Sequence, residues 1–344
     1  MEKLRIPIAL AGKDSAPGHM HIIAADSGGT KTHMALFEVD KGNFRIVRER
    51  IYKSKEWTTF TDMVMDFAAA PPQPDRLCFA VAGPVQDGRV HMTNLDWVID
   101  VKELQTTTGV EHISLINDLQ GIGYGLAALS SDDIETIYRP AVTMSGNAAI
   151  IAPGTGLGEA GLFWDGQALH PFDTEGGHTD FAARNSFDQE MYVYLQGKFG
   201  HVSWERLVSG MGIATIFDFL RDIHGWEVPS SLKKIIEQGD KASVIGQGAQ
   251  SGYPICMETV HIFTRYLAIE ASNLALKMKS TGGLYIGGGI PPKIWNSELR
   301  EVFLHHFFLV GRLRPLLESM PVHLIRNQHT ALLGAAYYGA YGHG

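Results

Sequence analysis

The chain has 344 residues, of which 45% are hydrophobic and 19% charged, and its net charge at pH 7 is −8. This length suggests about two domains, and the composition excludes an intrinsically disordered chain. The negative charge and the lack of a basic run argue against sequence-independent nucleic-acid binding, and no apolar stretch approaches the roughly 20 residues of a membrane span.

The N-terminal residues 1–20 contain one short apolar stretch, which Pro7 interrupts and Gly12 follows. Because this stretch is too short for a signal peptide, we expect a flexible N-terminal extension and a cytoplasmic protein. The two cysteines, Cys78 and Cys256, are far apart and outside any CxxC motif. This excludes a disulfide framework and a cysteine-rich zinc site.

The first predicted element is a strand at 21–25, which leads into the turn cluster Asp26-Ser-Gly-Gly-Thr30. Residues 31–39 alternate polar and apolar side chains, as a half-buried strand does. Together these segments predict a β-hairpin with glycines at its tip. Three further predicted elements follow: strands at 76–82 and 111–116, and a helix at 119–129.

A second hairpin of the same design is predicted around the tip Gly154-Thr-Gly-Leu-Gly158, with strands at 148–153 and 159–163. The later predicted elements are a long helix at 254–280, a strand at 284–286 that runs into Gly287-Gly-Gly289, and a final helix at 331–341. Strands that alternate with helices, and two similar hairpins, predict a duplicated α/β architecture with a cleft. The connecting loops are then the expected place for ligands.

The chain has 38 glycines, about 11% of its residues against an average of about 7%, and many of them lie in the two tips. Glycines let backbone N–H groups approach an anion closely. In the first tip Thr30 adds a hydroxyl donor, and Asp26 could hold a water molecule on Mg²⁺. An ordinary hairpin turn is the alternative for a single tip.

The second tip overlaps the spacing GxGxxG at residues 156–161, which is typical of dinucleotide-binding folds. That pattern must open a helix after a strand, whereas 159–163 is predicted as a returning strand. The chain also lacks the GxxxxGK[ST] motif of a P-loop enzyme. We therefore expect both tips to hold the β- and γ-phosphates of one nucleotide, with the Gly287–Gly289 run beside its nucleoside.

Three polar segments are candidates for chemistry. Asp118, which follows Asn117 at the end of a strand, could accept the proton of an alcohol that attacks a phosphoryl group, or else could cap a helix. Glu175-Gly-Gly-His178 could direct a carboxylate and an imidazole to one polyhydroxylated ligand; a plain turn or a metal site are the alternatives. Glu205 adds a further acid on a segment that could be a solvated helix start.

Taken together, these residues resemble the bacterial glucokinases, which are hexokinase-type kinases of the actin-like, hexokinase and Hsp70 ATPase superfamily. The matching pieces run in family order: 26–30, Ala82-Gly-Pro-Val85, Met92-Thr-Asn94, 116–118, 154–158, 175–181, Gly200-His-Val-Ser203, 205–206, 287–291 and Leu333-Gly334. The related repressor–kinase family places a cysteine-rich zinc loop beside its histidine. With two cysteines, this chain resembles the non-zinc branch.

The resemblance implies a duplicated actin-like, ribonuclease H-like ATPase fold, with two α/β domains flanking a cleft. The small domain would be 21–128 with 322–344, the large domain 129–321, and residues 1–20 an extension. Ser27 stands where the family usually has glycine, Pro153 precedes the second tip where a small residue is usual, and the segment 327–330 departs from the family pattern.

The implied activity is that of a transferase of glycolysis, a cytoplasmic, ATP-binding kinase that makes glucose 6-phosphate with Mg-ATP, often as a homodimer. Asp118 would be the general base, and Asp26 would hold Mg²⁺ through water. The implied substrate-binding residues are Asn117, Asp118, Glu175, His178 and Glu205; the implied nucleotide-binding residues are Asp26, Gly28, Gly29, Thr30, Gly154, Thr155, Gly156 and Gly288. A kinase for another hexose or N-acetylhexosamine, and a catalytically silent sugar sensor, are the alternatives.

Overall fold

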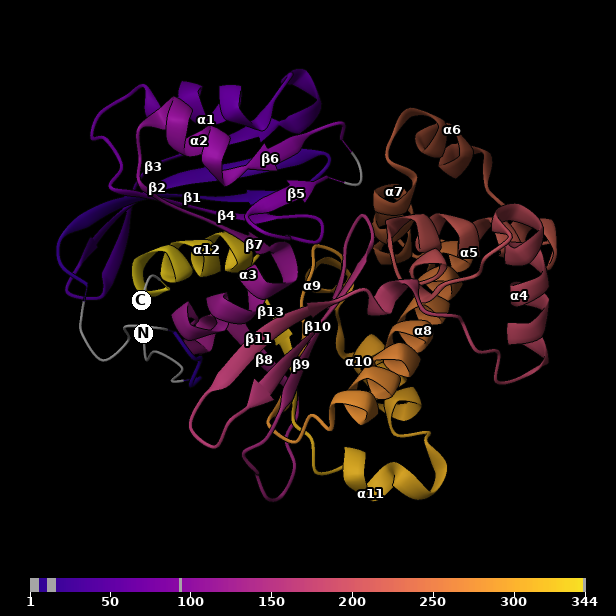
Figure 1. Ribbon diagram of the computed structural model, residues 1–344. Coiled ribbons are helices and arrows are strands. Elements are labelled where there is room, and N and C mark those ends of the chain that lie inside the picture. The colour runs from indigo at the N-terminus through magenta and orange to yellow at the C-terminus, as the bar shows by residue number, and fades with distance from the viewer. Residues whose placement is uncertain (1–5, 11–16, 93–94, 343–344) are drawn as a thin grey trace. The chain divides into compact units, whose positions relative to one another are not determined.

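The computed structural model describes residues 6–10, 17–92 and 95–342 (Figure 1). Its residues group into two units. Unit 1 holds residues 1–134, 162–173 and 327–344, and unit 2 holds residues 135–161 and 174–326. The domain limits expected from the sequence place residues 162–173 in the large domain. The structure groups this segment with unit 1.

Unit 1 is built on a five-stranded sheet of order β3-β2-β1-β4-β7. The strands are β1 (Met20–Ser27), β2 (Lys31–Asp40), β3 (Asn43–Lys53), β4 (Arg76–Val81) and β7 (His112–Asn117). β1 pairs antiparallel with β2 and parallel with β4, and β4 pairs parallel with β7. The first predicted hairpin and the strands at 76–82 and 111–116 are therefore confirmed, and β3 is an addition that the sequence reading missed.

Helices cover both faces of this sheet, because alternate residues of β1 point to opposite sides. Ile23 and Ala25 are buried in the cluster formed with α1 (Phe60–Ala68), and α2 (Val101–Thr108) contributes Leu104 to that cluster. Ile22 and Ala24 are buried with α12 (Thr330–Tyr341), on the opposite face. This last helix confirms the prediction at 331–341.

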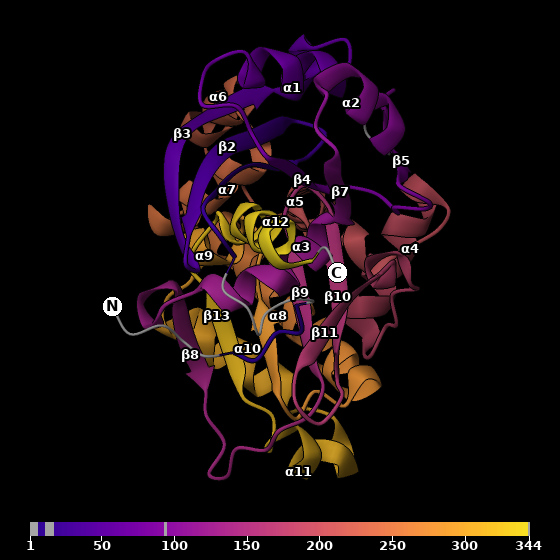
Figure 2. The ribbon, with the colours of Figure 1, turned by 60° about the vertical axis from the view of Figure 1, so that its left-hand side comes forward.

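Glycines let α12 pack directly against α3 (Asp118–Gly125), as Figure 2 shows. A Cβ at Gly125 would lie 2.1 Å from the carbonyl oxygen of Thr330, and a Cβ at Gly334 would lie 1.8 Å from that of Gly121. These contacts leave no room for side chains. The glycines of the helix predicted at 119–129 therefore permit close packing of the two helices. The helix ends earlier than predicted and continues as a 3₁₀ turn at Leu126–Ala128.

Two smaller features complete unit 1. β5 (Arg89–His91) and β6 (Val98–Asp100) form a separate antiparallel pair. Of the motif Met92-Thr-Asn94, Thr93 and Asn94 lie outside the described residues.

The short 3₁₀ helices of the described chain are Ser54–Glu56, Leu126–Ala128, Ser131–Asp133, Gly176–His178, Trp204–Arg206 and Gly311–Leu313.

The expectation of a flexible extension does not hold for residues 6–10. Ile8 forms a parallel bridge with Leu169 of β11 (Leu169–Thr174) and is fully buried. The N–H of Leu169 donates to the carbonyl of Pro7 at 2.7 Å, and that of Ala9 donates to Leu169 at 2.9 Å. The apolar stretch is therefore a short sheet-edge segment, since burying it removes apolar surface from water.

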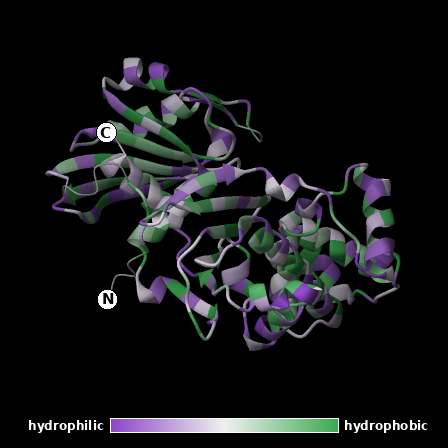
Figure 3. Cartoon of the chain, turned by 60° about the horizontal axis from the view of Figure 1, so that its bottom comes forward, coloured by the Kyte–Doolittle hydropathy of each residue, from purple (hydrophilic) through white to green (hydrophobic). Residues whose placement is uncertain are grey.

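A six-stranded sheet has the order β11-β10-β9-β12-β13-β8. Its remaining strands are β8 (Ile134–Tyr138), β9 (Ala148–Pro153), β10 (Leu157–Trp164), β12 (Gly283–Ile286) and β13 (Val322–Ile325). β12 pairs parallel with both β9 and β13 in unit 2, and nearly all residues of these strands are buried. Green, hydrophobic stretches occur along several strands and helices in Figure 3. The second predicted hairpin and the strand at 284–286 are confirmed.

Helices make up most of the rest of unit 2. The long α8 (Pro254–Met278) starts with proline, ends at Lys279 in a left-handed conformation and is buried along most of its length. Its observed limits match the helix predicted at 254–280. The others are α4 (Ser186–Phe199), α5 (Gly210–Asp222), α6 (Ser230–Gln238), α7 (Lys241–Gln250), α9 (Pro291–Ile294), α10 (Ser297–Phe307) and α11 (Arg314–Leu317).

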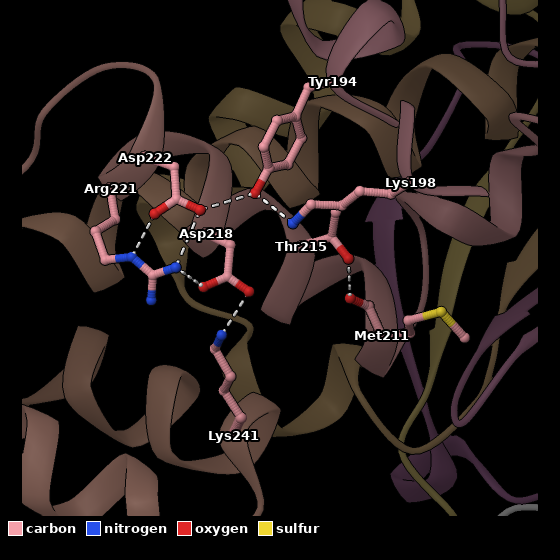
Figure 4. A network of polar contacts seen from close by, with 8 residues as sticks. All are labelled: Tyr194, Lys198, Met211, Thr215, Asp218, Arg221, Asp222 and Lys241. Atoms are coloured by element: carbon pink, nitrogen blue, oxygen red, sulfur yellow. Dashed lines mark hydrogen bonds and ion pairs between the residues drawn. The ribbon is translucent and has the colours of Figure 1, made fainter. Parts of the chain in front are cut away.

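Polar contacts join three of these helices (Figure 4). Asp222 of α5 accepts a hydrogen bond from Tyr194 of α4 at 3.2 Å. Asp218, one turn earlier on α5, accepts from Lys241 of α7 at 2.6 Å. Because both carboxylates belong to α5, these bonds fix the helix whose N-terminus reaches the second glycine tip.

Within the part of the chain that the structure describes, no helix combines the length and apolar character needed to cross a membrane.

Candidate active site

The first glycine tip connects β1 and β2 in unit 1. The N–H of Gly28 donates to the carbonyl of Lys31 at 3.0 Å, which closes the turn. The hydroxyl of Ser54 donates to the carbonyl of Gly28 at 2.9 Å, and its N–H donates to that of Thr30 at 3.1 Å. The tip is held from one side while Thr30 stays exposed, so its hydroxyl is accessible to a ligand.

A row of buried hydroxyls supports this tip. Ser27 lies 2.9 Å from Thr32, and Thr32 lies 3.1 Å from Ser54, measured between side-chain oxygens. All three side chains are fully buried. The structure therefore explains Ser27, which departs from the family glycine: its hydroxyl is the first member of a hydrogen-bonded row, so its burial carries little cost.

Asp26 lies at the end of β1, and burial raises its pKa to about 6, with Lys31 and then His329 acting in the opposite direction. Its register partner on β2 is His33, whose Nε2 lies 2.9 Å from the Glu49 carboxylate. The Nδ1 atoms of His33 and His329 are 3.1 Å apart. The sequence reading missed both histidines, because their distance along the chain hides this contact.

Asn117 and Asp118 share the turn from β7 into α3. The N-cap is Asn117, whose side-chain oxygen accepts from the N–H of Leu119 at 2.8 Å, so the alternative that Asp118 caps the helix is wrong. The Asn117 amide also donates to the carbonyl of Gly83 at 3.1 Å. Asp118 is the first helical residue, half-buried, and its Oδ1 accepts from the N–H of Leu119 at 3.0 Å.

The sheet register brings Asp26 and Asp118 to one edge. Ser27 pairs with Val81, and Val81 pairs with Asn117, so the ends of β1, β4 and β7 form one row. Two strand spacings correspond to about 10 Å. Unit 1 thus places two carboxyl groups and the first glycine tip at the same edge of its sheet.

The second glycine tip lies between β9 and β10 in unit 2. The N–H of Gly154 donates to the carbonyl of Gly156 at 2.8 Å, and the carbonyl of Gly154 accepts from Gly210 at 2.9 Å. Gly210 begins α5, so the positive end of that helix reaches the tip. A helix N-terminus beside a glycine turn is a typical anion-binding arrangement, and the sequence reading did not include this helix.

The turn at Gly287–Gly289 meets the same tip. The N–H of Gly287 donates to the carbonyl of Ile151 at 2.8 Å. At Gly288, φ is +79° and a Cβ would lie 2.3 Å from the carbonyl oxygen of Pro153. Glycine is therefore required there, and unit 2 brings the predicted phosphate tip and the predicted nucleoside turn together.

Glu205 lies in the 3₁₀ turn Trp204–Arg206, and its carboxylate reaches the second tip. Its Oε2 accepts from the N–H of Leu157 at 3.0 Å and lies 2.4 Å from where a Cβ of Gly156 would be. The alternative of a solvated helix start is wrong, since this carboxylate is bonded and half-buried. Glu205 therefore fixes the tip in addition to its predicted contact with a substrate.

Glu175 directly precedes the turn Gly176–His178, and His178 is the last residue of this turn. Both side chains are exposed. A Cβ at Gly177 would lie 2.2 Å from the carbonyl oxygen of Leu157. The two glycines thus serve close packing on β10. The N–H of Trp204 donates to the carbonyl of Thr179 at 3.1 Å, which ties this turn to the one that carries Glu205.

A buried pair of carboxyl groups lies under the Glu175–His178 turn. The exposed fractions of Glu159 and Glu270 are 1% and 0%. A Cβ at Gly176 would lie 2.1 Å from Oε2 of Glu159, so this carboxyl group contacts the turn. Burial and the charge of Glu270 raise the pKa of Glu159 to about 8. Asn273 donates to Glu270 at 2.8 Å.

The predicted site residues are thus divided between the units. Unit 1 contains Asp26, Gly28, Gly29, Thr30, Asn117 and Asp118; unit 2 contains Gly154, Thr155, Gly156, Glu175, His178, Glu205 and Gly288. Unit 1 holds one glycine tip with two carboxyl groups. Unit 2 holds the other glycine tip, a helix N-terminus, and exposed acid and imidazole groups.

Comparisons with known proteins identify the family. The family model for glucokinase matches residues 23–341. The glucokinase of Trichormus variabilis is 38% identical over 337 residues, a match that covers 93% of this chain and 98% of that protein. The crystal structure of a glucokinase from an Antarctic psychrotroph has a TM-score of 0.77 and 31% identity, covering 93% of this chain and 98% of the other.

A more distant structure shares the fold. The ROK family glucokinase from Streptomyces griseus, crystallised with glucose and AMPPNP, has a TM-score of 0.66 at 19% identity and covers 92% of this chain. The fold is therefore that of the actin-like sugar kinases, and the match extends over both units.

Proposed function

The chain belongs to the glucokinase family, and we propose that it transfers the γ-phosphoryl group of ATP to the 6-hydroxyl of glucose with Asp118 as the general base. The observation that carries this assignment is the position of Asp118. Its half-buried carboxylate stands at the first residue of α3, held by a backbone N–H at 3.0 Å, and shares a sheet edge with Asp26.

Phosphoryl transfer requires little covalent chemistry from the protein. Phosphoryl transfer requires alignment and charge neutralisation above all. Asp118 would orient the attacking hydroxyl and accept its proton, a role worth about 10²- to 10⁴-fold in rate. The ionised carboxylate is the form that can accept the proton.

The glycine tips are proposed to bind the phosphates. Gly29 and Thr30 from unit 1, and Thr155 and Gly156 from unit 2, would supply N–H and hydroxyl donors. Gly28 and Gly154 would shape the two tips, because their N–H groups close the turns. The N-terminus of α5 adds a positive partial charge at the second tip. Gly288 would contact adenosine through its backbone, and its close packing on Pro153 holds this turn at the second tip.

Mg²⁺ fits the chemistry of Asp26. A carboxylate oxygen is a preferred ligand of this ion, which usually keeps several of its waters. Burial raises the pKa of Asp26 to about 6, and a divalent cation nearby would lower that pKa again. Bound Mg²⁺ would neutralise the developing charge on the phosphates, and Asp26 would hold it through water.

Four residues are proposed to bind the sugar: Asn117, Glu175, His178 and Glu205. Hydrogen bonds from acids and amides to sugar hydroxyls give specificity, because a sugar that lacks one hydroxyl leaves a polar group unpaired. The exposed side chains of Glu175 and His178 are accessible for such contacts. We further propose that the enzyme works in the cytoplasm as a homodimer.

A panel of sugars tests this function. The value of kcat/KM is measured from ADP release with Mg-ATP for glucose, mannose, fructose and N-acetylglucosamine, with polyphosphate as an alternative donor. We expect glucose with ATP to give the highest value. A higher value for another sugar would assign a different substrate, and glucose binding without ADP release would indicate a silent sugar sensor.

A further inference from the structure

The end of the β1–β2 hairpin that lies away from the glycine tip carries two histidines and a glutamate. His21 is the second residue of β1, and His19 lies directly before the strand. On the neighbouring strand, Glu38 is the register partner of His21. Three groups that can bind a metal therefore meet on one side of two adjacent strands.

The distances are close to those of a metal site. Nε2 of His19 lies 3.1 Å from Oε1 of Glu38, and one ligand atom from each of the three residues lies within 4.8 Å of the others. Tetrahedral ligands at zinc distances are about 3.4 Å apart. The imidazole rings of His19 and His21 stand 5.3 Å apart, nearly perpendicular, so the ligand atoms would have to approach one another to bind an ion.

The backbone beneath these groups is fixed. The N–H of His21 donates to the Asp75 carboxylate at 2.7 Å, and the N–H of Asp75 donates to the carbonyl of His21 at 2.8 Å. The exposed fractions of the His19 and Glu38 side chains are 58% and 26%, so an ion can reach them from solvent. The site is thus both accessible and partly organised.

We propose that His19, His21 and Glu38 form a binding site for a divalent transition-metal ion of the Zn²⁺ class. Two imidazoles and one carboxylate are a ligand set that zinc favours, with one coordination position left open. Imidazole ligands select transition metals over Mg²⁺, which requires oxygen ligands. This site is separate from Asp26 and from the Mg²⁺ proposed there.

Arg45 competes with the metal for the glutamate. Its Nε donates to Oε2 of Glu38 at 2.9 Å, and a terminal nitrogen of the same guanidinium also contacts that oxygen. The positive charge next to the site opposes binding of a cation. Removal of the guanidinium should therefore increase metal affinity.

The test is a titration of the full-length protein with Zn²⁺ in a competing fluorescent chelator, and with Co²⁺ followed by visible absorption. We expect one strong equivalent, and at least a tenfold loss of affinity in His21→Ala and in Glu38→Gln. Arg45→Ala should bind at least threefold more tightly. His170→Ala is the matched control, because that exposed histidine has one carboxylate partner, Asp165, at 2.6 Å.

Thermal unfolding gives a second readout. A metal that joins β1 to β2 binds the folded state, so Tm should rise with Zn²⁺ in the parent protein and not in His21→Ala. Glucose phosphorylation stays unchanged in these variants, since none belongs to the proposed active site. Equal affinity in the parent and His21→Ala, or loss of binding only in His170→Ala, would overturn the proposal.

Discussion

Asp26 combines burial with a role that requires its charge. Its pKa of about 6 means that the folded protein without ligands holds a proton on this group more tightly than the unfolded chain does. The free energy of unfolding therefore decreases, through this group, as pH rises from about 4 to about 6. A shift of this size is worth about 3 kcal/mol.

We predict that Asp26→Asn is more stable than the parent at pH 7 and much less active. The amide removes a partly buried charge, whereas phosphoryl transfer loses the group proposed to hold Mg²⁺. Urea unfolding without ligands and kcat at saturating Mg²⁺ measure the two effects. The control is Asp40→Asn, an exposed position on the same hairpin. A variant that is both less stable and fully active would contradict this account of Asp26.

The Glu159–Glu270 pair gives a pH dependence of the same sign as that of Asp26, but at higher pH. Because burial and Glu270 raise the pKa of Glu159 to about 8, the stability that this group contributes is complete below its usual pKa and is lost as pH rises through 8. We expect Tm to decrease between pH 6 and pH 9 in the parent and to decrease less in Glu159→Gln.

The exposed Glu301 provides the control for that experiment, as Glu301→Gln on α10. The same pH change should raise KM for glucose in the parent, because Glu159 contacts the turn between Glu175 and His178. If the parent and Glu159→Gln lose Tm equally over this range, the carboxyl pair does not control the stability of unit 2.

Single residues divide clearly into those that the sequence predicts and those it does not. Asp118 could be proposed because it follows an apolar strand, and the tips because their glycines are adjacent in the chain. His329 and Glu270 could not, since their partners His33 and Glu159 are more than 100 positions away. Whether Glu205 lies in solvent or on a glycine tip also depends on the folded chain.

Among the elements, α3 and α12 show how glycine acts within helices. Intrinsic propensity makes glycine unfavourable there, by about 1 kcal/mol relative to alanine. In this pair the lack of side chains lets the helices approach each other, with Gly334 facing the carbonyl of Gly121. A local pattern of glycines cannot distinguish a weak helix from a closely packed one.

We predict that Gly334→Ala destabilises the protein by at least about 2 kcal/mol, because its Cβ would lie 1.8 Å from the Gly121 oxygen. The control is Gly197→Ala in α4, where a Cβ would have no neighbour within 4 Å. That change should stabilise by about 0.5–1 kcal/mol. Urea midpoints measure both, and equal midpoints for the two variants would contradict the packing argument.

The two hairpins, the long helix and the last helix could be predicted from the sequence because each has a strong local pattern. The sequence reading missed β3, which is exposed along most of its length and carries several arginines, and the helices between 186 and 250. It also expected a flexible N-terminus, whereas Ile8 is buried beside Leu169. Pairing with a strand about 160 positions away leaves no local signal.

For the whole molecule, the ordered motifs predicted the family, and the family match over 23–341 confirms it. The grouping of 162–173 and 327–344 with the N-terminal unit depends on contacts between distant segments. The net charge of −8 is unfavourable for binding ATP. The affinity for ATP should therefore depend on Mg²⁺ and on the N–H groups of the two glycine tips, and not on the electrostatic potential of the whole surface.

The central claim is that Asp118 is the base of a glucose kinase, and single-turnover phosphorylation by Asp118→Asn tests it most directly. The rate of glucose 6-phosphate formation should decrease by about 10²- to 10⁴-fold. Glucose affinity by calorimetry should stay within a few fold, and the exposed control Asp132→Asn should match the parent in both. An unchanged phosphoryl-transfer rate in Asp118→Asn would contradict the account.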